Sequence, residues 1–355
     1  MDPVIITTWI VEIIKIFIIA TALMLGFAVM TLVERKLVAR FTMRYGPNRA
    51  GKYGLLQPVA DMFKMFFKEE VIPGHVDRLV YVMAPGIALV PAIIAFAVVP
   101  LASQPFAIPF TEQIFGAPIM VTPWVADINV GLLYVLAIGS LGTYGVILGG
   151  WSSNNKYSLL GGLRTSAQML SYELPMGVAL LSVAMLAGSL RMTEIVSLQS
   201  GFWGLGWLIF FQPVAFLIFF ISGLAEAGRS PFDLPETENE LIGGFVTEYG
   251  GMKFGLFFGA EYIHTIILSA MTTTLFLGGW NGPFAEQIPV LGFFYFMVKV
   301  AVMLFVIIWV RASIPRVRFD KLMRFCWKFL LPLGLVNLVV TALIIGVINT
   351  ANGNW

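Results

Sequence analysis

Eight apolar stretches, each long enough to cross a bilayer as a helix, constrain the fold of this chain more than any other feature. An α-helix needs about 20 consecutive apolar residues to cross a hydrocarbon core of ~30 Å. Hydrophobic residues make up 58% of the 355 residues and charged residues only 12%, which is more apolar surface than a soluble fold can bury. The alternating segments of a transmembrane β-barrel are absent from the sequence. The sequence therefore predicts an all-α polytopic membrane protein with about eight transmembrane helices in a single membrane domain, residues 1–355. The stretches cover approximately residues 8–33, 78–101, 128–150, 165–188, 206–226, 248–278, 291–311 and 328–349.

The basic residues predict the orientation of these helices. Nine lysines and arginines follow the first stretch, and six more lie between Arg311 and Lys328 after the seventh. The loops after the second, fourth and sixth stretches contain only Arg191 between them. Because basic loops stay on the cytoplasmic side, we expect the odd-numbered loops inside and both chain ends outside.

The first basic loop contains an amphipathic segment at about residues 55–70. Its apolar residues recur at helical spacing, and its polar residues form an opposing row. This pattern predicts a helix that lies in the membrane interface. Two roles remain open for it: a solvated cap on the bundle, or a lip over an opening that admits an apolar ligand from the bilayer. The apolar row comprises Leu55, Leu56, Val59, Met62, Phe63 and Phe66, and the polar row Gln57, Asp61, Lys64 and Lys68.

The loop at about residues 227–247 is strongly acidic and lies between two apolar stretches. Its carboxylates, together with Glu226 and Glu248 at its borders, face a single cation, Arg229. Two further acids, Glu173 and Glu261, lie inside apolar stretches. Carboxylates are costly near hydrocarbon and often mark proton pathways, so we interpret the group as a proton-handling site. The alternative is that each acid is paired structurally with a cation such as Arg229 or Lys253.

Glycines at positions 251, 255 and 259 recur every fourth residue in the sixth apolar stretch, and Gly145 and Gly149 repeat this spacing in the third. Small residues at this spacing allow helices in a membrane to approach closely. We interpret both sets as packing residues rather than as ligand contacts.

The sequence offers no catalytic or metal site of its own. Glu261 and His264 form one Glu-x-x-His pair, but a di-iron centre needs two such pairs, and His75 does not supply the second. One cysteine, Cys326, cannot hold an iron–sulfur cluster alone. Phosphate-loop, nucleophile-elbow and HExxH motifs are absent. We therefore expect no covalent chemistry, no bound metal and no redox centre in this chain, and the scattered basic residues do not predict nucleic-acid binding.

Seven sequence motifs of the chain resemble a known family, the H subunit of bacterial NADH:quinone oxidoreductase (respiratory complex I). The mitochondrially encoded counterpart of this subunit is NADH dehydrogenase subunit 1. The resemblance extends from about residue 20 to the end of the eighth stretch. Its motifs are ERK at 34–36, RYGPNRAG at 44–51, LQPVADMFKMFFKEE at 56–70, SYELP at 171–175, AEAGRSPFDLPETENELIGGF at 225–245, TEYGGMKFGLFFGAEY at 247–262 and IPRVRFDKLM at 314–323.

This resemblance implies a tilted bundle of eight helices that forms a tunnel for quinone and the first part of a buried charge path to the proton pumps. Proton-path residues implied by the motifs are Glu34, Glu173, Glu226, Glu236, Glu238, Glu240, Glu248 and Glu261. Quinone-tunnel residues implied in the same way are Arg35, Arg44, Asp61, Phe63, Arg229, Phe232 and Arg318.

The resemblance also implies partners and a location. Quinone is the substrate, while NADH, FMN and the iron–sulfur clusters bind to partner subunits. Those partners are the quinone-site subunits of the peripheral arm and the adjacent small membrane subunits, and lipids surround the chain. A bacterial inner membrane is expected rather than a mitochondrial one, with both termini periplasmic.

Three other functions compete with this interpretation. One is the homologous membrane subunit of an energy-converting hydrogenase or formate hydrogenlyase, which the PETENELIGGF segment disfavours. A secondary transporter would show inverted repeats, which the sequence lacks. A structural anchor for soluble subunits would leave the intramembrane acids as an unexplained cost.

Overall fold

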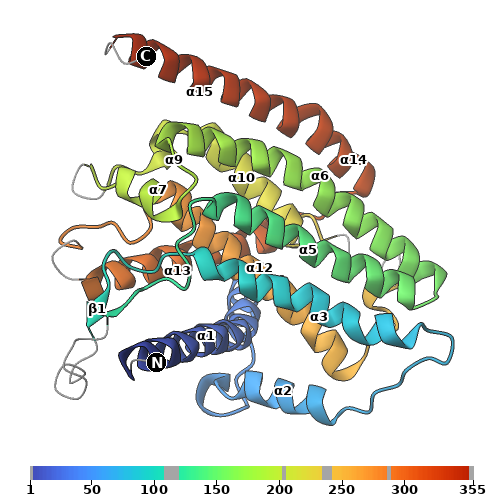
Figure 1. The fold of residues 1–355 in the computed structure, drawn as a ribbon. Helices are drawn as coiled ribbons and strands as arrows, with labels where there is room; N and C mark the ends of the chain where they lie inside the picture. Colours follow the sequence, from blue (N-terminus) through green and yellow to red (C-terminus); the bar gives the residue numbers. More distant parts are fainter. Residues whose placement is uncertain (1–2, 108–119, 202–204, 234–241, 286–288, 352–355) are drawn as a thin grey trace.

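The computed structural model describes residues 3–107, 120–201, 205–233, 242–285 and 289–351, and most of them are helical (Figure 1). Seven helical segments in this described part are long and apolar enough to cross a membrane. They confirm an all-α polytopic membrane protein. The helices that form them are α1 (Pro3–Phe41), α3 (Arg78–Ala95), α5 (Gly131–Ser152), α6 (Lys156–Ala187), α12 (Gly251–Phe276), α13 (Pro289–Ser313) and α15 (Leu331–Ala351).

Shorter elements connect these helices. A five-residue π-helical segment, Cys326–Leu330, joins α14 to α15 without a break. Strands β1 (Phe106–Ala107) and β2 (Met120–Val121) form a two-residue antiparallel pair in which Phe106 is opposite Val121. Turns of 3₁₀ helix lie at Lys52–Gly54, Phe96–Val98 and Gly244–Val246. The short helices are α2 (Gln57–Phe67), α7 (Met192–Leu198), α9 (Leu208–Phe211), α10 (Pro213–Glu226) and α14 (Phe319–Phe325).

The fifth predicted helix, at 206–226, is divided into two pieces. Pro213 begins α10 and lacks a backbone N–H, and Gln212 before it has non-helical angles (φ −131°, ψ 55°). The 14 residues of α10 span only roughly 21 Å, less than a full bilayer core. Side chains of α15 compensate for the break: the Gln212 Nε2 group donates to Thr341 Oγ1 at 2.8 Å, and Asn337 Nδ2 donates to Gln212 Oε1 at 3.0 Å.

Both ends of the described chain lie at the same end of the bundle, at the left of Figure 1, together with β1 and α7. An odd number of crossings would place them at opposite ends. The α9–α10 pair therefore acts as the eighth passage through the bundle, although neither piece is long enough alone.

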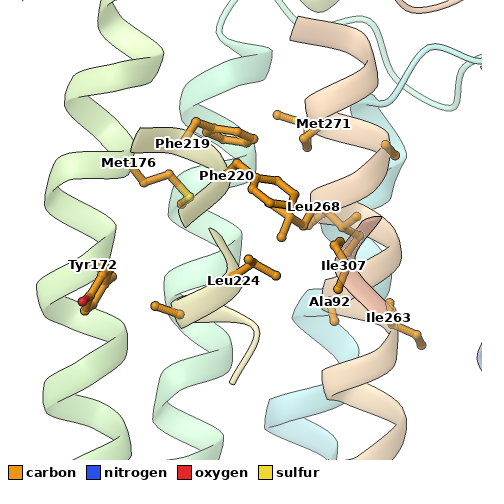
Figure 2. Packing of buried hydrophobic residues seen from close by; sticks show 14 of the residues in the cluster. Ala92, Tyr172, Met176, Phe219, Phe220, Leu224, Ile263, Leu268, Met271 and Ile307 are labelled. Atoms are coloured by element: carbon orange, nitrogen blue, oxygen red, sulfur yellow. The ribbon is translucent and has the colours of Figure 1, made fainter. Parts of the chain in front are cut away.

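Helix α12 lies at the centre of the bundle. It contacts α1, α2, α3, α10 and α13, and 72% of its most apolar 18-residue stretch is buried. By contrast, only 11% of the most apolar 18-residue stretch between α14 and α15 is buried, because α15 packs mainly on α6. Figure 2 shows the apolar core around α12, where Phe219 and Leu224 of α10 lie between Tyr172 of α6 and Leu268 of α12.

Glycines bring the helices together, as their spacing predicts. A Cβ atom at Gly145 of α5 would lie 2.5 Å from the backbone nitrogen of Ala88 in α3, so only glycine allows this approach. On α12, a Cβ atom at Gly255 would lie 2.8 Å from Met65 Sδ of α2, and one at Gly259 would lie 3.5 Å from the Phe27 ring of α1. Gly145 therefore has the packing role that its spacing predicts, whereas Gly255 and Gly259 also line the cavity between α1, α2 and α12 that is described below.

Helix α2 begins and ends within the predicted amphipathic segment, at Gln57 and Phe67. Pro58 lies in its first turn, where a missing N–H costs nothing. None of its residues is buried, and the ring of Phe67 is 83% exposed. A row of exposed apolar side chains on a helix at the edge of the bundle suits a membrane interface.

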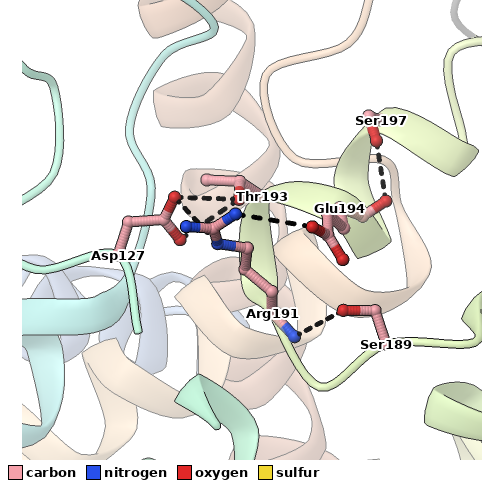
Figure 3. Close-up of polar contacts among 6 residues, drawn as sticks. All are labelled: Asp127, Ser189, Arg191, Thr193, Glu194 and Ser197. Carbon is pink, nitrogen blue, oxygen red and sulfur yellow. Dashed lines mark hydrogen bonds and ion pairs between the residues drawn. The ribbon is translucent and has the colours of Figure 1, made fainter. Parts of the chain in front are cut away.

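Polar contacts fix the end of the bundle opposite α2 (Figure 3). The guanidinium of Arg191 lies 3.2 Å from Asp127 and 3.5 Å from Glu194, and Thr193 Oγ1 donates to Asp127 Oδ1 at 3.1 Å. A hydrogen bond with Ser189 lowers the pKa of the Glu194 carboxyl below its usual value; desolvation opposes this effect, and the nearby Arg191 lowers the pKa further. These contacts connect α7 to the segment that precedes α5.

Candidate functional site

A buried ion cluster joins α1, α13 and the loop after α10. It consists of Glu34, Arg229 and Arg311, and we refer to it as the Glu34 ion cluster. Arg229 Nη1 lies 3.2 Å from Glu34 Oε2, and Arg311 Nη1 pairs with the other carboxylate oxygen. The side chains of Arg229 and Glu34 are only 5% and 9% exposed. Two guanidinium groups on one carboxylate leave a net positive charge among the helices.

The Glu34 ion cluster is connected to α12 through Arg229. Its guanidinium lies 3.8 Å from the centre of the Tyr262 ring, within the range of a cation–π contact. Arg229 Nε donates to Thr265 Oγ1 at 3.2 Å, and Thr265 in turn donates to the backbone oxygen of Glu261 at 2.8 Å. A continuous polar path thus runs from Glu34 to the helical turn that carries Glu261.

A second ion pair connects α1 to α2. Arg35 Nη1 donates to Asp61 Oδ2 at 2.7 Å, and Gln57 Nε2 donates to Asp61 Oδ1 at 2.9 Å. Arg35 and Asp61, both predicted tunnel residues, are therefore in direct contact. Arg35 directly follows Glu34 on α1, so the Arg35–Asp61 pair and the Glu34 ion cluster begin at consecutive residues.

Two cavities meet at the Arg35–Asp61 pair. The apolar cavity has a volume of about 200 Å³ and lies between α1, α2 and α12, with walls that include Met24, Phe27, Ala28, Met62, Met65 and Phe258. The basic cleft has a volume of about 370 Å³ and is lined by Lys64, Lys68, Tyr249, Gly250 and Phe254. Arg35, Asp61 and Met65 line both spaces.

Two of the predicted proton-path acids line a third, smaller space. We refer to it as the carboxylate cavity; its volume is about 30 Å³, and Glu226, Glu261 and His264 line it. Glu226 is the last residue of α10, and Glu173 of α6 lies near enough for the two carboxylates to repel each other. The fold thus gathers three acids that are far apart in the sequence.

Glu248 has a different environment from these three acids. Asn155 Nδ2, at the start of α6, donates to Glu248 Oε1 at 2.7 Å, and the Tyr81 hydroxyl donates to the backbone oxygen of Glu248 at 2.6 Å. The rings of Tyr81 and Tyr249 stack at 4.2 Å beside it. Glu248 does not line the carboxylate cavity.

The remaining predicted tunnel residues do not line these spaces. Arg44 is exposed, and Arg318 is 75% exposed and lies 3.4 Å from Asp320. Phe63 stacks on Phe67 with 6.1 Å between ring centres, whereas Phe232 is buried against the Tyr172 ring at 5.9 Å. Glu236, Glu238 and Glu240 lie outside the described residues.

Several polar residues of the site were not identified from the sequence. Thr265 and Tyr262 lie beside Glu261 on α12, and the Glu261-to-Thr265 spacing of one helical turn was an available signal. Lys299 donates to the backbone oxygens of Leu277 at 2.7 Å and Gly279 at 3.0 Å, at the end of α12. Lys15 of α1 pairs with Glu12 at 2.5 Å.

No three His, Cys, Asp or Glu side chains come together as a metal site in the part of the chain that the structure describes. The fold and the site define a polytopic membrane protein that buries carboxylates and arginines among its transmembrane helices. A family model described as NADH dehydrogenase matches residues 14–342, and the chain belongs to this family.

Relatives that match nearly the full length of the chain are all named as the H subunit of NADH-quinone oxidoreductase. The chain is 50% identical over 335 residues to NADH-quinone oxidoreductase H subunit 1 of Geobacter sulfurreducens, covering 93% of this chain and 94% of the relative. It is 48% identical over 348 residues to H subunit 2 of the same enzyme in Geobacter metallireducens (95% and 96%), and 47% identical over 343 residues to the H subunit in Deinococcus deserti (94% and 84%). As a member of this family, the chain is a membrane subunit of an oxidoreductase complex, complex I, and other subunits of that complex are its partners.

Proposed function

We propose that this subunit forms the passage by which quinone reaches its reduction site from the bilayer, and that it carries the first part of the path that couples this reduction to proton translocation. The observation that supports the passage most directly is the meeting of the apolar cavity and the basic cleft at the Arg35–Asp61 pair. A quinone combines a long apolar tail with a polar head group. One apolar and one polar space that share a wall match these two parts, as binding sites for small amphiphiles do.

The position of α2 agrees with the second of its two predicted roles. Pro58, Asp61 and Met62 of α2 contribute to the wall of the apolar cavity, opposite Phe27 of α1 and Phe258 of α12. The exposed apolar face of α2 would lie in the membrane interface, so a lipid-soluble molecule would pass this helix as it leaves the bilayer.

The proton path is proposed from a sequence of polar contacts. A change of charge on the quinone head group would act first on Arg35 and Asp61, and next on the adjacent Glu34 ion cluster. Arg229 and Thr265 connect this cluster to the turn of Glu261, which lines the carboxylate cavity with Glu226. In a low-dielectric interior such a network transmits a change of charge more strongly than it would in water. The proposed result is a change in the protonation of the carboxylates.

The passage is tested by filling the apolar cavity. Ala28 lines this cavity, while its neighbour Val29 is 55% exposed and does not line it. In the assembled complex, Ala28→Trp should raise the KM for a long-tailed quinone about tenfold or more, equivalent to ~1.4 kcal/mol. Val29→Trp is the matched control and should leave the KM unchanged. NADH oxidation by a water-soluble acceptor that takes electrons before the quinone should be the same in both variants. Equal quinone KM values for the two variants would exclude the apolar cavity as the passage.

The proton path is tested by Glu226→Gln and Glu261→Gln in the assembled complex. Each change preserves the shape of the side chain but removes its proton affinity, so proton translocation in sealed vesicles should be lost. Glu69→Gln, at an exposed position, is the control. Normal pumping in the Glu226 and Glu261 variants would exclude both residues from the path.

The membrane, orientation and cofactors follow from the same proposal. The subunit would lie in a bacterial inner membrane with both termini periplasmic, since basic loops favour the cytoplasmic side. NADH, FMN and iron–sulfur clusters would bind to partner subunits of the peripheral arm. Purification of the complex through a tag on this chain should yield a flavin-containing assembly that reduces quinone with NADH. A hydrogenase assembly without NADH activity would support the alternative function instead.

A further inference from the structure

His264 has a position among the helices that neither packing nor metal binding explains. It lies one helical turn after Glu261 on α12 and is only half-buried, although it is in the middle of the bundle. It lines the carboxylate cavity and also an adjoining cavity of about 50 Å³, whose other walls are mainly apolar residues of α5, α6, α10 and α12. The exposed surface of His264 therefore faces internal space.

Glu226 is the other titratable residue, among those described, that lines both cavities. Glu261 lines only the carboxylate cavity. Each cavity is large enough for at least one water molecule, because about 15 Å³ suffices. His264 and Glu226 thus lie between the two cavities.

Two glycines of α5 leave room for these side chains. A Cβ atom at Gly139 would lie 3.4 Å from Glu226 Oε1, and one at Gly142 would lie 3.2 Å from His264 Nε2. Gly139 and Gly142 are three residues apart on one helix face, a rise of roughly 4.5 Å. Glu226 and His264 therefore contact the same strip of α5 about one turn apart.

The surroundings of His264 suit proton transfer better than a fixed structural role. Structural polar groups in a protein interior are nearly always held by hydrogen bonds. The structure shows no hydrogen bond between the His264 imidazole and another described residue. The titratable groups around it come from three helices: Glu261 on its own helix α12, Glu226 of α10, and Glu173 of α6 next to Glu226.

We propose that His264 transfers protons between Glu261 and Glu226. In this step one ring nitrogen accepts a proton from the Glu261 carboxyl, directly or through water in the carboxylate cavity. The other ring nitrogen releases a proton to the Glu226 carboxylate, which leaves the neutral imidazole in its other tautomer, and rotation of the ring restores the first one. Imidazole is the side chain best suited to this step because it accepts at one nitrogen while it donates at the other. The inference rests on the proposed proton path and adds to it a residue that is not an acid.

The test uses His264→Ala in the assembled complex, with His75→Ala as the matched control. His75 is the only other histidine, and it lies exposed in the loop before α3. The rate of proton translocation should fall about 100-fold in the His264 variant, the lower range for loss of a positioned proton donor. The control should keep the original rate. Added imidazole should restore much of the lost rate, whereas pyrazole, which has the same shape but is a far weaker base, should not.

Two results would overturn the inference: an unchanged rate in His264→Ala, or a lost rate that imidazole and pyrazole restore equally or not at all. If the alanine variant does not assemble, His264→Gln replaces it. Glutamine retains hydrogen-bonding groups, but its amide does not take up or release a proton near neutral pH. Normal pumping in His264→Gln would then refute the proposal. Glu226→Gln is measured in parallel: if it abolishes pumping while the His264 variants do not, only the role of His264 is wrong, and if it has no effect, the proposed path itself is wrong.

Discussion

Replacement of Arg229 by methionine should destabilise the bundle far more than the same change at an exposed arginine. Arg229 joins three parts of the fold through its ion pair with Glu34, its hydrogen bond to Thr265 and its contact with the Tyr262 ring. Methionine has similar length and can pack on the ring, but it cannot pair with a carboxylate. Arg318→Met is the control, because Arg318 and its partner Asp320 are 75% and 67% exposed.

The expected cost follows from the burial of the pair. Removal of one partner from a buried ion pair costs about 3–5 kcal/mol, since the remaining charge is left in a low-dielectric interior. Glu34 still has Arg311 as a partner, which favours the lower end of this range, about 3 kcal/mol. An exposed pair such as Arg318–Asp320 contributes less than about 1 kcal/mol.

The measurement is the half-life of NADH:quinone activity of the purified complex at raised temperature. A loss of about 3 kcal/mol from the native state accelerates unfolding by up to ~150-fold, while the control variant should change the half-life by no more than about fivefold. The double variant Glu34→Gln/Arg229→Met should lose less than the sum of the single changes, because the residues are coupled. Similar half-lives for Arg229→Met and Arg318→Met would refute the view that the Glu34 ion cluster holds the helices together.

Three further outcomes are expected. Lys299→Met should shorten the thermal half-life of the complex by removing charged hydrogen bonds at the end of α12, worth about 2 kcal/mol, whereas the exposed Lys321→Met should not. Gln212→Leu should cost about 1 kcal/mol, because the junction of α9 and α10 loses its hydrogen bonds to α15, and increased proteolysis near residue 212 would report this loss. Asp61→Asn should raise the quinone KM about tenfold without slowing electron transfer to a water-soluble acceptor, and an unchanged KM would argue against the Arg35–Asp61 pair as a head-group contact.

Hydropathy predicted the long helices well because each is defined by its own local sequence. The sixth stretch, predicted at 248–278, is α12 at Gly251–Phe276, and its glycine spacing correctly indicated close packing. The fifth stretch shows the limit of this reasoning. A window of apolar residues does not register the break, although Pro213 is a local signal for it. The compensating hydrogen bonds cannot be read from the sequence, because they come from α15, more than 120 residues away.

The functional interpretation of the acids stays a prediction, and the sequence did not predict their partners. Glu34 and Arg229 are 195 residues apart, and no periodicity connects α1 to the loop after α10. The sequence therefore left open whether Arg229 pairs with an acid of its own loop. In the structure it pairs with Glu34 of α1 instead, while Lys253, the other cation considered, pairs with Glu70 at 2.6 Å. Only the folded arrangement distinguishes an acid held by cations, such as Glu34, from acids that line a cavity, such as Glu226.

The glycines of α5 show why spacing alone does not define the role of a small residue in a membrane helix. A side chain at Gly145 would collide with the backbone of α3 at Ala88, so this glycine sets the distance between two helices. One turn earlier, a side chain at Gly142 would meet the imidazole of His264, and at Gly139 it would meet the carboxylate of Glu226. A buried titratable group needs space for water or for a moving proton donor, because without it the charged form is too costly to reach. One glycine-rich face of α5 therefore serves two purposes: it packs against α3 at one position and leaves room for the side chains of His264 and Glu226 at the others.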